Sequence, residues 1–554
     1  MVFLDIITAL KFKDYLNFII FSFLIYVFQF YYKYFTRPNK LPGPLPLPFI
    51  ECSYLFDTDA KQLFISLHKK YGDVCEVYLG GFRRISISRP EYLENMLASS
   101  ATDTTFMTRA PYSKGLEELG MAGRGLIFNH DVKSWKYNRQ FFNKAVQSSS
   151  FNLEAIKWVD KIFQEIEVYW KSLANNNNLS RDDNLQDNKN NWCLETDLSL
   201  WARSFTSDMI IILTTGERSY GIALLYNKLS PTKVSRSGTL IEDSERFIQG
   251  ISKQILGVSY FMFISSPLRH SIPFVKKNVK SLIENRDYLL ERLEMIVKKR
   301  KKEIEETPIG EELRQDLLTS LIITNTERDK DNVKAIDGKI LRPMTDVEIR
   351  GNMLDAFIGG TETTANLFCF LTYYICQYPQ VKQKMIAEID TIFSQSTCLN
   401  HEGLTKLEYC TAIIKEVARI IPPLSILARY TDKPCEMVGY KWDAGTIFHV
   451  NLNGLHKHKD HWSNPEIFDP DRFYKKKDED RHKYSFAMFG GGLRACPGRK
   501  LAMIELLSLL VLIYRKYDIE LVDLKAPLKT KSAILTICKE LPVRIKPRKL
   551  DHFF

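Results

Sequence analysis

A glycine-rich stretch at residues 489–499 presents a single cysteine in a setting that suits a metal ligand. Residues 501–514 are mostly apolar and contain good helix formers, so Cys496 should lie just before a helix N-terminus. That end of a helix carries partial positive charge and unpaired N–H groups, which favour the thiolate, the form of cysteine that binds metals. The glycines let the backbone approach a large flat ligand, and Arg494 could pair with a carboxylate on it. The alternative is a structural cysteine beside a flexible loop.

A second stretch that could take part in a reaction is Gly359-Gly360-Thr361-Glu362-Thr363-Thr364. It lies inside an apolar segment that ends near residue 377. Two glycines within a helix cost about 1 kcal/mol each relative to alanine. Close helix packing would explain them, and so would a local distortion of the helix. In the second case the Thr363 hydroxyl would bond the carbonyl of Gly359, four residues back, leaving a groove with a hydroxyl and an acid beside it.

Three further patterns are weak when each is taken alone. Trp135 and Arg139 are four residues apart, and Glu416 and Arg419 are three apart, so each pair shares one helix face. Such pairs are common on protein surfaces. Residues 465–473 read P-x-x-F-x-P-x-R-F and end in Arg472 and a phenylalanine.

Together these patterns resemble the cytochrome P450 monooxygenases. The cysteine stretch matches the haem-thiolate loop F-x-x-G-x-R-x-C-x-G at every fixed position. The glycine stretch resembles the family's (A/G)-G-x-(D/E)-T motif, and the 416–419 and 465–473 patterns resemble its Glu-Arg-Arg network. The resemblance covers about residue 40 to the C-terminus, and it implies one large domain, mainly α with small β-sheets, of the cytochrome P450 fold.

The resemblance also implies a role for each matching residue. Cys496 would be the axial ligand of the iron of haem b, and its thiolate would donate electron density to that iron. Glu362 and Thr363 would deliver protons to the oxygen atom that leaves as water. Residues expected to contact the cofactor are Trp135, Arg139, Arg429, Phe489, Arg494 and Gly498, and those expected to brace the cysteine loop are Glu416, Arg419 and Arg472. The expected substrate pocket is apolar: Phe357, Ile358, Leu424, Ile426, Ala533 and Ile534.

The activity implied is monooxygenation of an apolar substrate (a lipid, a sterol or a xenobiotic), with O₂ as co-substrate. No G-x-G-x-x-G lies between a strand and a helix, and the chain has no room for a flavin module, so electrons should come from NADPH through a separate membrane-bound reductase. Its acidic surface could meet Lys133, Lys136, Lys144, Arg499 and Lys500, although a merely solvated surface is the alternative. Two other functions remain open: a haem-thiolate isomerase or dehydratase that acts on peroxides without a reductase, and a non-enzymatic haem-binding or sensor protein.

The N-terminal region predicts attachment to a membrane. Residues 1–14 form a short tail, and residues 15–32 are an uncharged apolar run just long enough to cross a bilayer, without the cleavage site of a signal peptide. Residues 33–48 are a basic and proline-rich hinge, and residues 49–554 are the haem domain. The family implies the endoplasmic reticulum membrane, with the domain in the cytosol. The ten scattered cysteines, which include no C-x-x-C pair, suit that reduced compartment, and the net charge of +11 suits an anionic partner or membrane surface and not nucleic acid.

Several helices and strands must position these residues. Helices are expected at residues 58–71, 90–98, 197–215, 275–306 and 345–377 and from residue 131 onward, with strands at 74–79 and 83–88 and a loop at 109–128. The segment 345–348, Thr-Asp-Val-Glu, fits a capping box that opens the long helix. Residues 174–191 are rich in Asn and Asp and poor in apolar side chains, so they should be a disordered insertion.

Overall fold

The structure is a computed structural model of the full chain. It describes residues 11–55, 60–97, 103–109, 114–178, 192–235, 244–329, 342–393, 398–475, 481–532 and 534–548. Within these ranges the protein is mainly helical with small sheets, which confirms the expected fold class.

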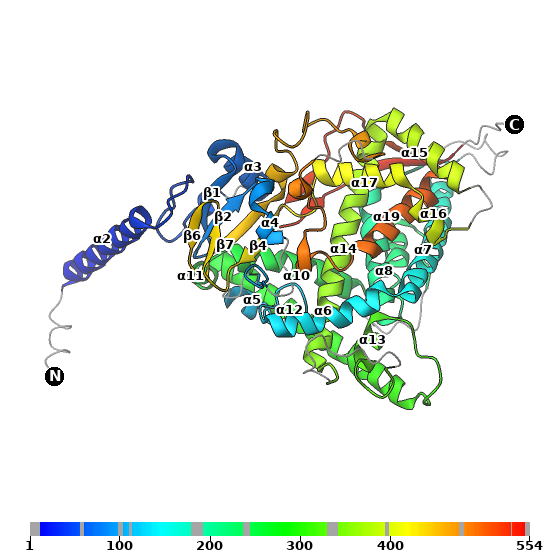
Figure 1. Ribbon diagram of the computed structural model, residues 1–554. Helices are drawn as coiled ribbons and strands as arrows, with labels where there is room; N and C mark the ends of the chain where they lie inside the picture. Colours follow the sequence, from blue (N-terminus) through cyan, green and yellow to red (C-terminus); the bar gives the residue numbers. More distant parts are fainter. Residues whose placement is uncertain are drawn as a thin grey trace.

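The molecule consists of a large helical body and one helix that projects from it (Figure 1). The projecting helix, α2 (Phe12–Thr36), is apolar and has no buried residue. It is longer at both ends than the predicted run of 15–32. Of the described residues, α2 alone is long and apolar enough to cross a membrane. The strands at residues 74–87 and 426–451 lie on the same side of the body as α2, and most helices lie on the opposite side (Figure 1).

The main sheet has four strands in the order β1-β2-β7-β4. Strands β1 (Val74–Leu79) and β2 (Phe82–Ile87) form an antiparallel hairpin, and the second strand begins one residue earlier than predicted. Its two-residue turn is Gly80-Gly81, and both glycines have positive φ, which residues with a Cβ rarely adopt. Strand β7 (Ile447–Asn451) runs parallel to β2, and β4 (Ile426–Tyr430) runs antiparallel to β7.

Helix α14 (Asp346–Gln377) runs through the middle of the helical body (Figure 1). Thr345 and Glu348 form the predicted capping box at its start. Helix α8 (Leu198–Thr215) packs against it, and both helices are buried along most of their length. The expected helices at 345–377 and 197–215 are therefore confirmed.

Helix α7 (Ser149–Asn178) extends into the N-terminal edge of the insertion expected at residues 174–191, so that boundary is corrected. Residues 174–178 are helical, because the packed face of α7 continues through Leu173 and Ala174, both buried. Trp192, at the far edge of the asparagine-rich stretch, is also buried and lies 5.6 Å from the ring of Tyr517. The insertion from 179 to 191 lies outside the described residues.

Helices α6 (Val132–Gln147), α17 (Glu408–Ile420) and α19 (Arg499–Tyr514) carry the remaining motifs. Helix α6 begins where predicted, because the Asp131 side chain accepts hydrogen bonds from the N–H groups of Lys133 and Ser134. The other helices are α3 (Ala60–Tyr71), α4 (Glu94–Leu97), α5 (Lys114–Glu118), α9 (Gly221–Leu229), α10 (Ser244–Phe263), α11 (Ser266–Ser271), α12 (Pro273–Glu306), α13 (Leu317–Ile323), α15 (Pro379–Ile392), α16 (His401–Thr405) and α18 (Leu452–Leu455).

Two sequence expectations need adjustment here. The helix expected at 90–98 is a 3-10 turn (Pro90–Tyr92) followed by the four-residue α4, and the loop expected at 109–128 contains α5. Three small sheets complete the fold. They comprise β3 (Leu194–Asp197) with β11 (Pro542–Pro547) and β8 (Tyr517–Leu521); β5 (Cys435–Met437) with β6 (Tyr440–Trp442); and β9 (Thr530–Ser532) with β10 (Thr536–Cys538).

Candidate functional site

The cysteine loop is a compact turn that leads into α19. Gly490 and Gly492 have φ values of 70° and 62°, so both positions favour glycine. The Cys496 N–H donates to the carbonyl of Phe489 at 2.8 Å, which closes the loop. A Cβ on Gly498 would lie 3.9 Å from the Cys496 sulfur. The loop therefore holds one sulfur at the start of a helix, as the sequence predicted.

The Cys496 side chain is exposed, although it lies within the body of the protein. Burial raises the pKa of its thiol, whereas the Gly498 N–H and the positive charges of Arg139 and Arg109 favour the thiolate. A sulfur that faces an internal space has exposed area and is also surrounded by protein. The exposure of Cys496 and the effect of burial on its pKa are therefore consistent. The sequence predicts that the helix terminus favours the thiolate, and the Gly498 N–H acts in that direction. Burial has the larger effect, so the pKa of the thiol is raised in the protein alone.

Four arginines gather around this loop: Arg109, Arg139, Arg429 and Arg494. Burial and mutual repulsion lower the pKa of Arg494, with Arg109, Arg429 and Arg139 all contributing, and only Asp355 opposes them. Burial and Arg109 lower the pKa of Arg429 to about 9. Uncompensated buried positive charge is costly, so this cluster suits a ligand with more than one carboxylate.

Arg109 was missed by sequence reasoning. It comes from an irregular segment and belongs to none of the quoted motifs, so only the fold reveals its place. Its guanidinium donates to the carbonyl of Arg494 at 3.2 Å.

Besides the predicted pairing with a ligand carboxylate, Arg494 forms hydrogen bonds and a ring contact within the protein. Its guanidinium donates to the carbonyls of Met107, Leu126 and Asn129 at 2.6, 2.7 and 2.7 Å. It also lies 4.2 Å from the ring centroid of Trp135, a cation–π contact. Three of its five N–H groups thereby donate to backbone carbonyls of the described residues.

Trp135 and Arg139 reach the same loop from α6. Arg139 donates to the carbonyl of Ala495, next to the cysteine, at 2.7 Å, and its guanidinium lies 5.8 Å from the Trp135 ring. Trp135 is thus in contact with two arginines of the cluster. The fold brings together the tryptophan and arginines that the sequence assigned to cofactor contacts.

On α14, the Thr363 hydroxyl donates to the carbonyl of Gly359 at 2.6 Å, which confirms the predicted bond. The two glycines have different surroundings. A Cβ on Gly359 would meet no atom within 4 Å, and Gly359 is exposed, whereas a Cβ on Gly360 would lie 2.7 Å from the Ile210 side chain of α8. Close packing therefore explains Gly360, and Gly359 borders open space beside Thr363.

Glu362 points away from that open space. Its carboxylate accepts hydrogen bonds from Ser252 at 2.9 Å and from Asn366 at 3.1 Å, and it lies 3.6 Å from the Arg203 guanidinium. The acid is buried on the side of α14 that faces α8 and α10. It cannot contact Thr363 in this arrangement, because adjacent helical residues point about 100° apart.

The Glu416–Arg419 pair is completely buried. Arg419 donates to both carboxylate oxygens at 2.7 Å, and the Arg472 guanidinium lies 3.5 Å from the same carboxylate. Arg419 also donates to three backbone carbonyls, of His456, Pro465 and Ile467. This network ties together residues 456–472, which precede the cysteine loop, and it brings together the three residues that the family resemblance groups.

The positions predicted for the substrate pocket fall into two groups. Leu424 and Ile534 are brought close, because Ser425 donates to the carbonyl of Ile534 at 3.1 Å, and Ile426 begins β4. On α14, Ile358 is buried beside Gly359, whereas Phe357 packs against Phe247 with ring centroids 5.6 Å apart. Ala533 lies outside the described residues.

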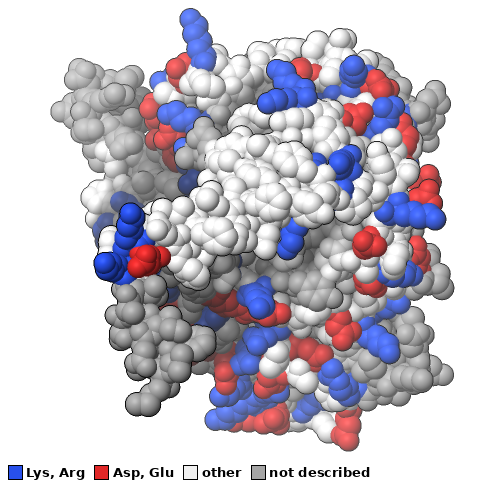
Figure 2. Space-filling view, turned by 90° about the vertical axis from the view of Figure 1, so that its left-hand side faces the viewer, with Lys and Arg blue, Asp and Glu red and all other residues white. Residues whose placement is uncertain are grey.

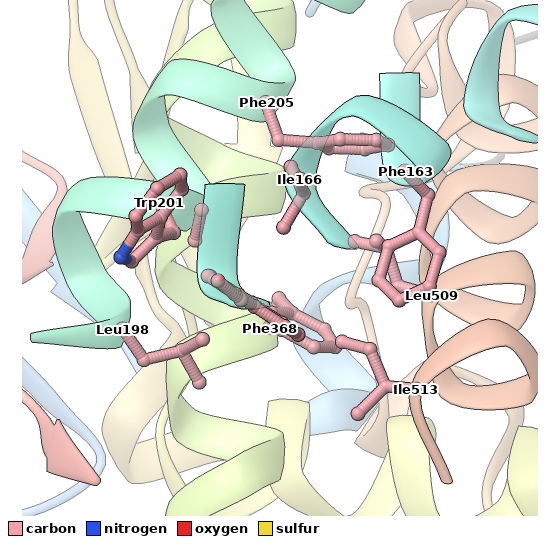
Figure 3. A pocket seen from close by; sticks show the side chains of 10 residues that line it. Phe163, Ile166, Leu198, Trp201, Phe205, Phe368, Leu509 and Ile513 are labelled. Atoms are coloured by element: carbon pink, nitrogen blue, oxygen red, sulfur yellow. The ribbon is translucent and has the colours of Figure 1, made fainter. Parts of the chain in front are cut away.

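A separate cavity of about 20 Å³ lies in the core between α7, α8, α14 and α19 (Figure 3). Its lining is entirely apolar: Phe163, Ile166, Trp170, Leu198, Trp201, Ala202, Phe205, Phe368, Leu509 and Ile513. Neither Cys496 nor Thr363 lines it, so this void is a packing defect of the core and not the candidate site.

Cys496, Gly359 and the four arginines fit a flat iron-containing group that carries carboxylates. The Cys496 side chain and Gly359 are both exposed, and the four arginines offer positive charge to carboxylates. Among the described residues no group of three or more His, Cys, Asp or Glu side chains could hold a metal ion. Thiolate-ligated haem takes one cysteine sulfur from the protein, which Cys496 could supply.

Comparison with known proteins agrees with this arrangement. The family model "Cytochrome P450" matches residues 41–547. Cytochrome P450 3A9 of Rattus norvegicus is 23% identical over 98% of this chain and 99% of its own length. Thromboxane-A synthase of Macaca fascicularis is 24% identical over 90% of each chain. The crystal structure of the cytochrome P450DA heme domain superposes with a TM-score of 0.70 at 18% identity, covering 92% of this chain and 98% of that one, and it supports the fold alone.

Proposed function

The chain belongs to the cytochrome P450 family, and we propose that it is a monooxygenase that inserts one oxygen atom of O₂ into an apolar lipid, sterol or xenobiotic. The family binds haem, so a haem group held at Cys496 is the cofactor. NADPH would supply the electrons through a separate reductase.

The residues of the chain divide the work around that cofactor. Cys496 would ligate the iron, while Arg109, Arg139, Arg429 and Arg494 would bind the two propionates and relieve their own mutual repulsion. When bound, the haem supplies oxygen activation, which protein side chains cannot perform alone.

Proton supply is the work of α14. The Thr363 hydroxyl, held by the Gly359 carbonyl at 2.6 Å, would hold and pass a proton at the open face of the helix. Glu362 would receive protons on the opposite side, where Ser252 and Arg203 connect it toward α10 and α8. Transfer between the two must use water or rotation of the Glu362 side chain, because their side chains point in different directions.

The observation that carries this proposal is the Thr363 hydroxyl beside the open position of Gly359. Thr363→Ala removes that hydroxyl and leaves the arginine cluster and Cys496 unchanged. General acid catalysis contributes about 10²–10⁴-fold. We therefore expect the variant to consume NADPH at a near-normal rate, with a reductase present, and to release hydrogen peroxide in place of product.

The measured quantity is the ratio of product to NADPH consumed. Thr364→Ala is the matched control, because Thr364 is a buried threonine at the next position. An unchanged ratio in Thr363→Ala would show that this hydroxyl is not the proton donor. Cys496→His tests the iron ligand separately. We expect this variant to lose the red-shifted Soret band of the reduced carbon monoxide complex.

A second candidate is a haem-thiolate synthase or isomerase that needs no reductase. Its support is the similarity to thromboxane-A synthase, whose identity to this chain (24%) is as high as that of the cytochrome P450 3A relatives. Turnover of a lipid peroxide without NADPH, unaffected by Thr363→Ala, would favour this candidate over the monooxygenase.

A reductase could dock on the basic surface formed by α6 and the start of α19. Lys133, Arg499 and Lys500 are exposed there, whereas Lys144 forms an ion pair with Asp329 at 2.8 Å and is less available. Charge reversal at Lys133 and Lys500 should raise the apparent KM for the reductase and leave peroxide-driven turnover nearly intact. Equal loss in both assays would assign these lysines to haem binding or folding.

Membrane attachment is supported by α2 and by the turn at residues 47–51. The ring of Phe49, at the tip of the turn, stacks on Tyr26 of α2 with centroids 4.4 Å apart. Phe49 and Ile50 are exposed. The side of the molecule from which α2 projects shows a broad area without charge (Figure 2). We infer that α2 crosses the endoplasmic reticulum membrane and that this turn reaches the bilayer, with the haem domain in the cytosol. Asn178 begins the glycosylation sequon Asn-Leu-Ser, so a glycan on Asn178 would contradict that orientation.

A further inference from the structure

One stripe of α14 carries Gly351, Asp355, Gly359 and Thr363, each four residues after the last. Residues at this spacing form a row along the helix that turns by about 40° at each step, so each residue lies next to the following one. The last two border the open face described above. The first two contact the segment of residues 120–129, which joins α5 to α6.

Gly351 and Gly125 allow the segment to approach α14 closely. A Cβ on Gly351 would lie 2.8 Å from the Gly125 nitrogen, and a Cβ on Gly125 would lie 2.7 Å from the Gly351 carbonyl. Gly125 also has a φ of +62°. The segment therefore crosses the helix backbone to backbone, one turn before the open face begins.

Asp355 binds the segment at this crossing. One carboxylate oxygen of Asp355 accepts the N–H groups of Leu126 at 2.5 Å and Ile127 at 2.9 Å. The carbonyl of the same Leu126 accepts from Arg494 of the cysteine loop at 2.7 Å. A single peptide segment thus connects the helix that carries Thr363 to the loop that carries Cys496.

We propose that Asp355 is a positioning residue whose carboxylate holds residues 120–129 across α14 and thereby sets the cysteine loop relative to the open face beside Thr363. The proposal deepens the proposed function but does not require oxygenation, because any reaction between these two elements needs the same spacing.

Burial raises the pKa of Asp355 to about 7, against the effect of the Leu126 and Ile127 N–H groups and of the two charged groups that face it, Arg109 and Arg494. The neutral carboxyl is therefore accessible in the folded protein near neutral pH. A neutral side chain of the same shape should be tolerated, while the hydrogen bonds it accepts should be weaker.

The experiment is amide hydrogen exchange of residues 120–129 in the haem-loaded full chain, comparing wild type with Asp355→Asn. Bonds to a charged acceptor are about twice as strong as neutral ones, so we expect exchange of this segment to accelerate about tenfold or more in the variant at pH 8.5. Asp346→Asn is the matched control, because Asp346 is an acid of the same helix that pairs with Lys301 at the surface.

Two further readouts separate positioning from a general structural effect. The exchange difference between wild type and Asp355→Asn should shrink as pH falls from 8.5 to 6, because the wild-type carboxyl becomes protonated. Gly125→Ala, whose Cβ would lie 2.3 Å from the Asp355 carboxylate, should accelerate exchange in the same segment by displacing it.

The proposal is overturned if Asp355→Asn exchanges residues 120–129 at the wild-type rate at pH 8.5, or if the difference between them does not depend on pH. Neither outcome depends on product formation. Failure of the monooxygenase proposal therefore leaves this test standing, and the reverse also holds.

Discussion

The neighbouring glycines of α14 offer a sharp test, because the same substitution should have opposite effects at the two positions. In Gly359→Ala the new methyl group meets no atom within 4 Å. Replacing a glycine inside a helix by alanine stabilises the helix by about 1 kcal/mol, chiefly by lowering the entropy of the unfolded chain. We expect the free energy of unfolding to rise by that amount.

In Gly360→Ala the methyl group would lie 2.7 Å from both Cδ1 and Cγ1 of Ile210. Overpacking of this kind costs about 1–3 kcal/mol, against the same gain of about 1 kcal/mol. The net effect should lie between zero and a loss of about 2 kcal/mol, so the two variants should differ by about 1–3 kcal/mol.

The assay is urea unfolding of the haem-loaded protein, followed by the haem absorption band, for wild type and both variants at one haem concentration. Ile210→Val serves as a partner substitution, because the shorter side chain should recover part of the stability lost in Gly360→Ala. Equal destabilisation by both alanines would refute the reasoning, since it would mean that Gly359 is also a packing position and that no open face adjoins Thr363.

The remaining predictions concern the buried network, pH and the membrane. Glu416→Ala leaves the buried Arg419 without its acid, so it should cost about 3–5 kcal/mol and reduce haem retention, and a loss below 1 kcal/mol in the same urea assay would contradict this. Burial lowers the pKa of His456 to about 3, against about 6.5 in the unfolded chain. The free energy of unfolding should therefore fall by up to about 1.4 kcal/mol per pH unit as pH drops below 6.5. Urea unfolding at pH 7 and 5.5 should show this dependence, and His456→Gln should flatten it. An environment-sensitive fluorescent amino acid in place of Phe49 should shift to shorter wavelength when the full chain is inserted into phosphatidylcholine vesicles, whereas the same probe at the exposed Ile309 should not; identical spectra would exclude contact of the turn with lipid.

Local signals accounted for the parts of the fold that depend on nearby residues. A capping box marked the start of α14 at Thr345, because the bond that its side chain accepts comes from a residue three positions away. The hydroxyl bond of Thr363 spans one turn of its own helix, so its spacing was enough to predict it.

Contacts between distant segments were beyond sequence reasoning. Arg109 joins the arginine cluster, and Asp355 takes two N–H groups of a segment more than 200 residues away, without any local pattern to mark either. Glu362 was placed beside Thr363 by its neighbouring position, yet its partners are Ser252 and Asn366 on the other side. The asparagine-rich stretch was assigned to disorder by composition, although its first residues complete a packed helix.

The sequence by itself identified the glycine-rich loop of Cys496, the bond between Thr363 and Gly359 and the resemblance to the family, because each rests on residue types at short, fixed spacing. Only the tertiary structure decided that Gly359 is open while Gly360 is packed, that four arginines converge on the cysteine loop, and that Asp355 joins this loop to α14. The physical reason is that hydrogen bonds within a turn are encoded by neighbours, whereas burial and charge repulsion depend on every segment that packs nearby, and the order of residues along the chain does not specify that packing.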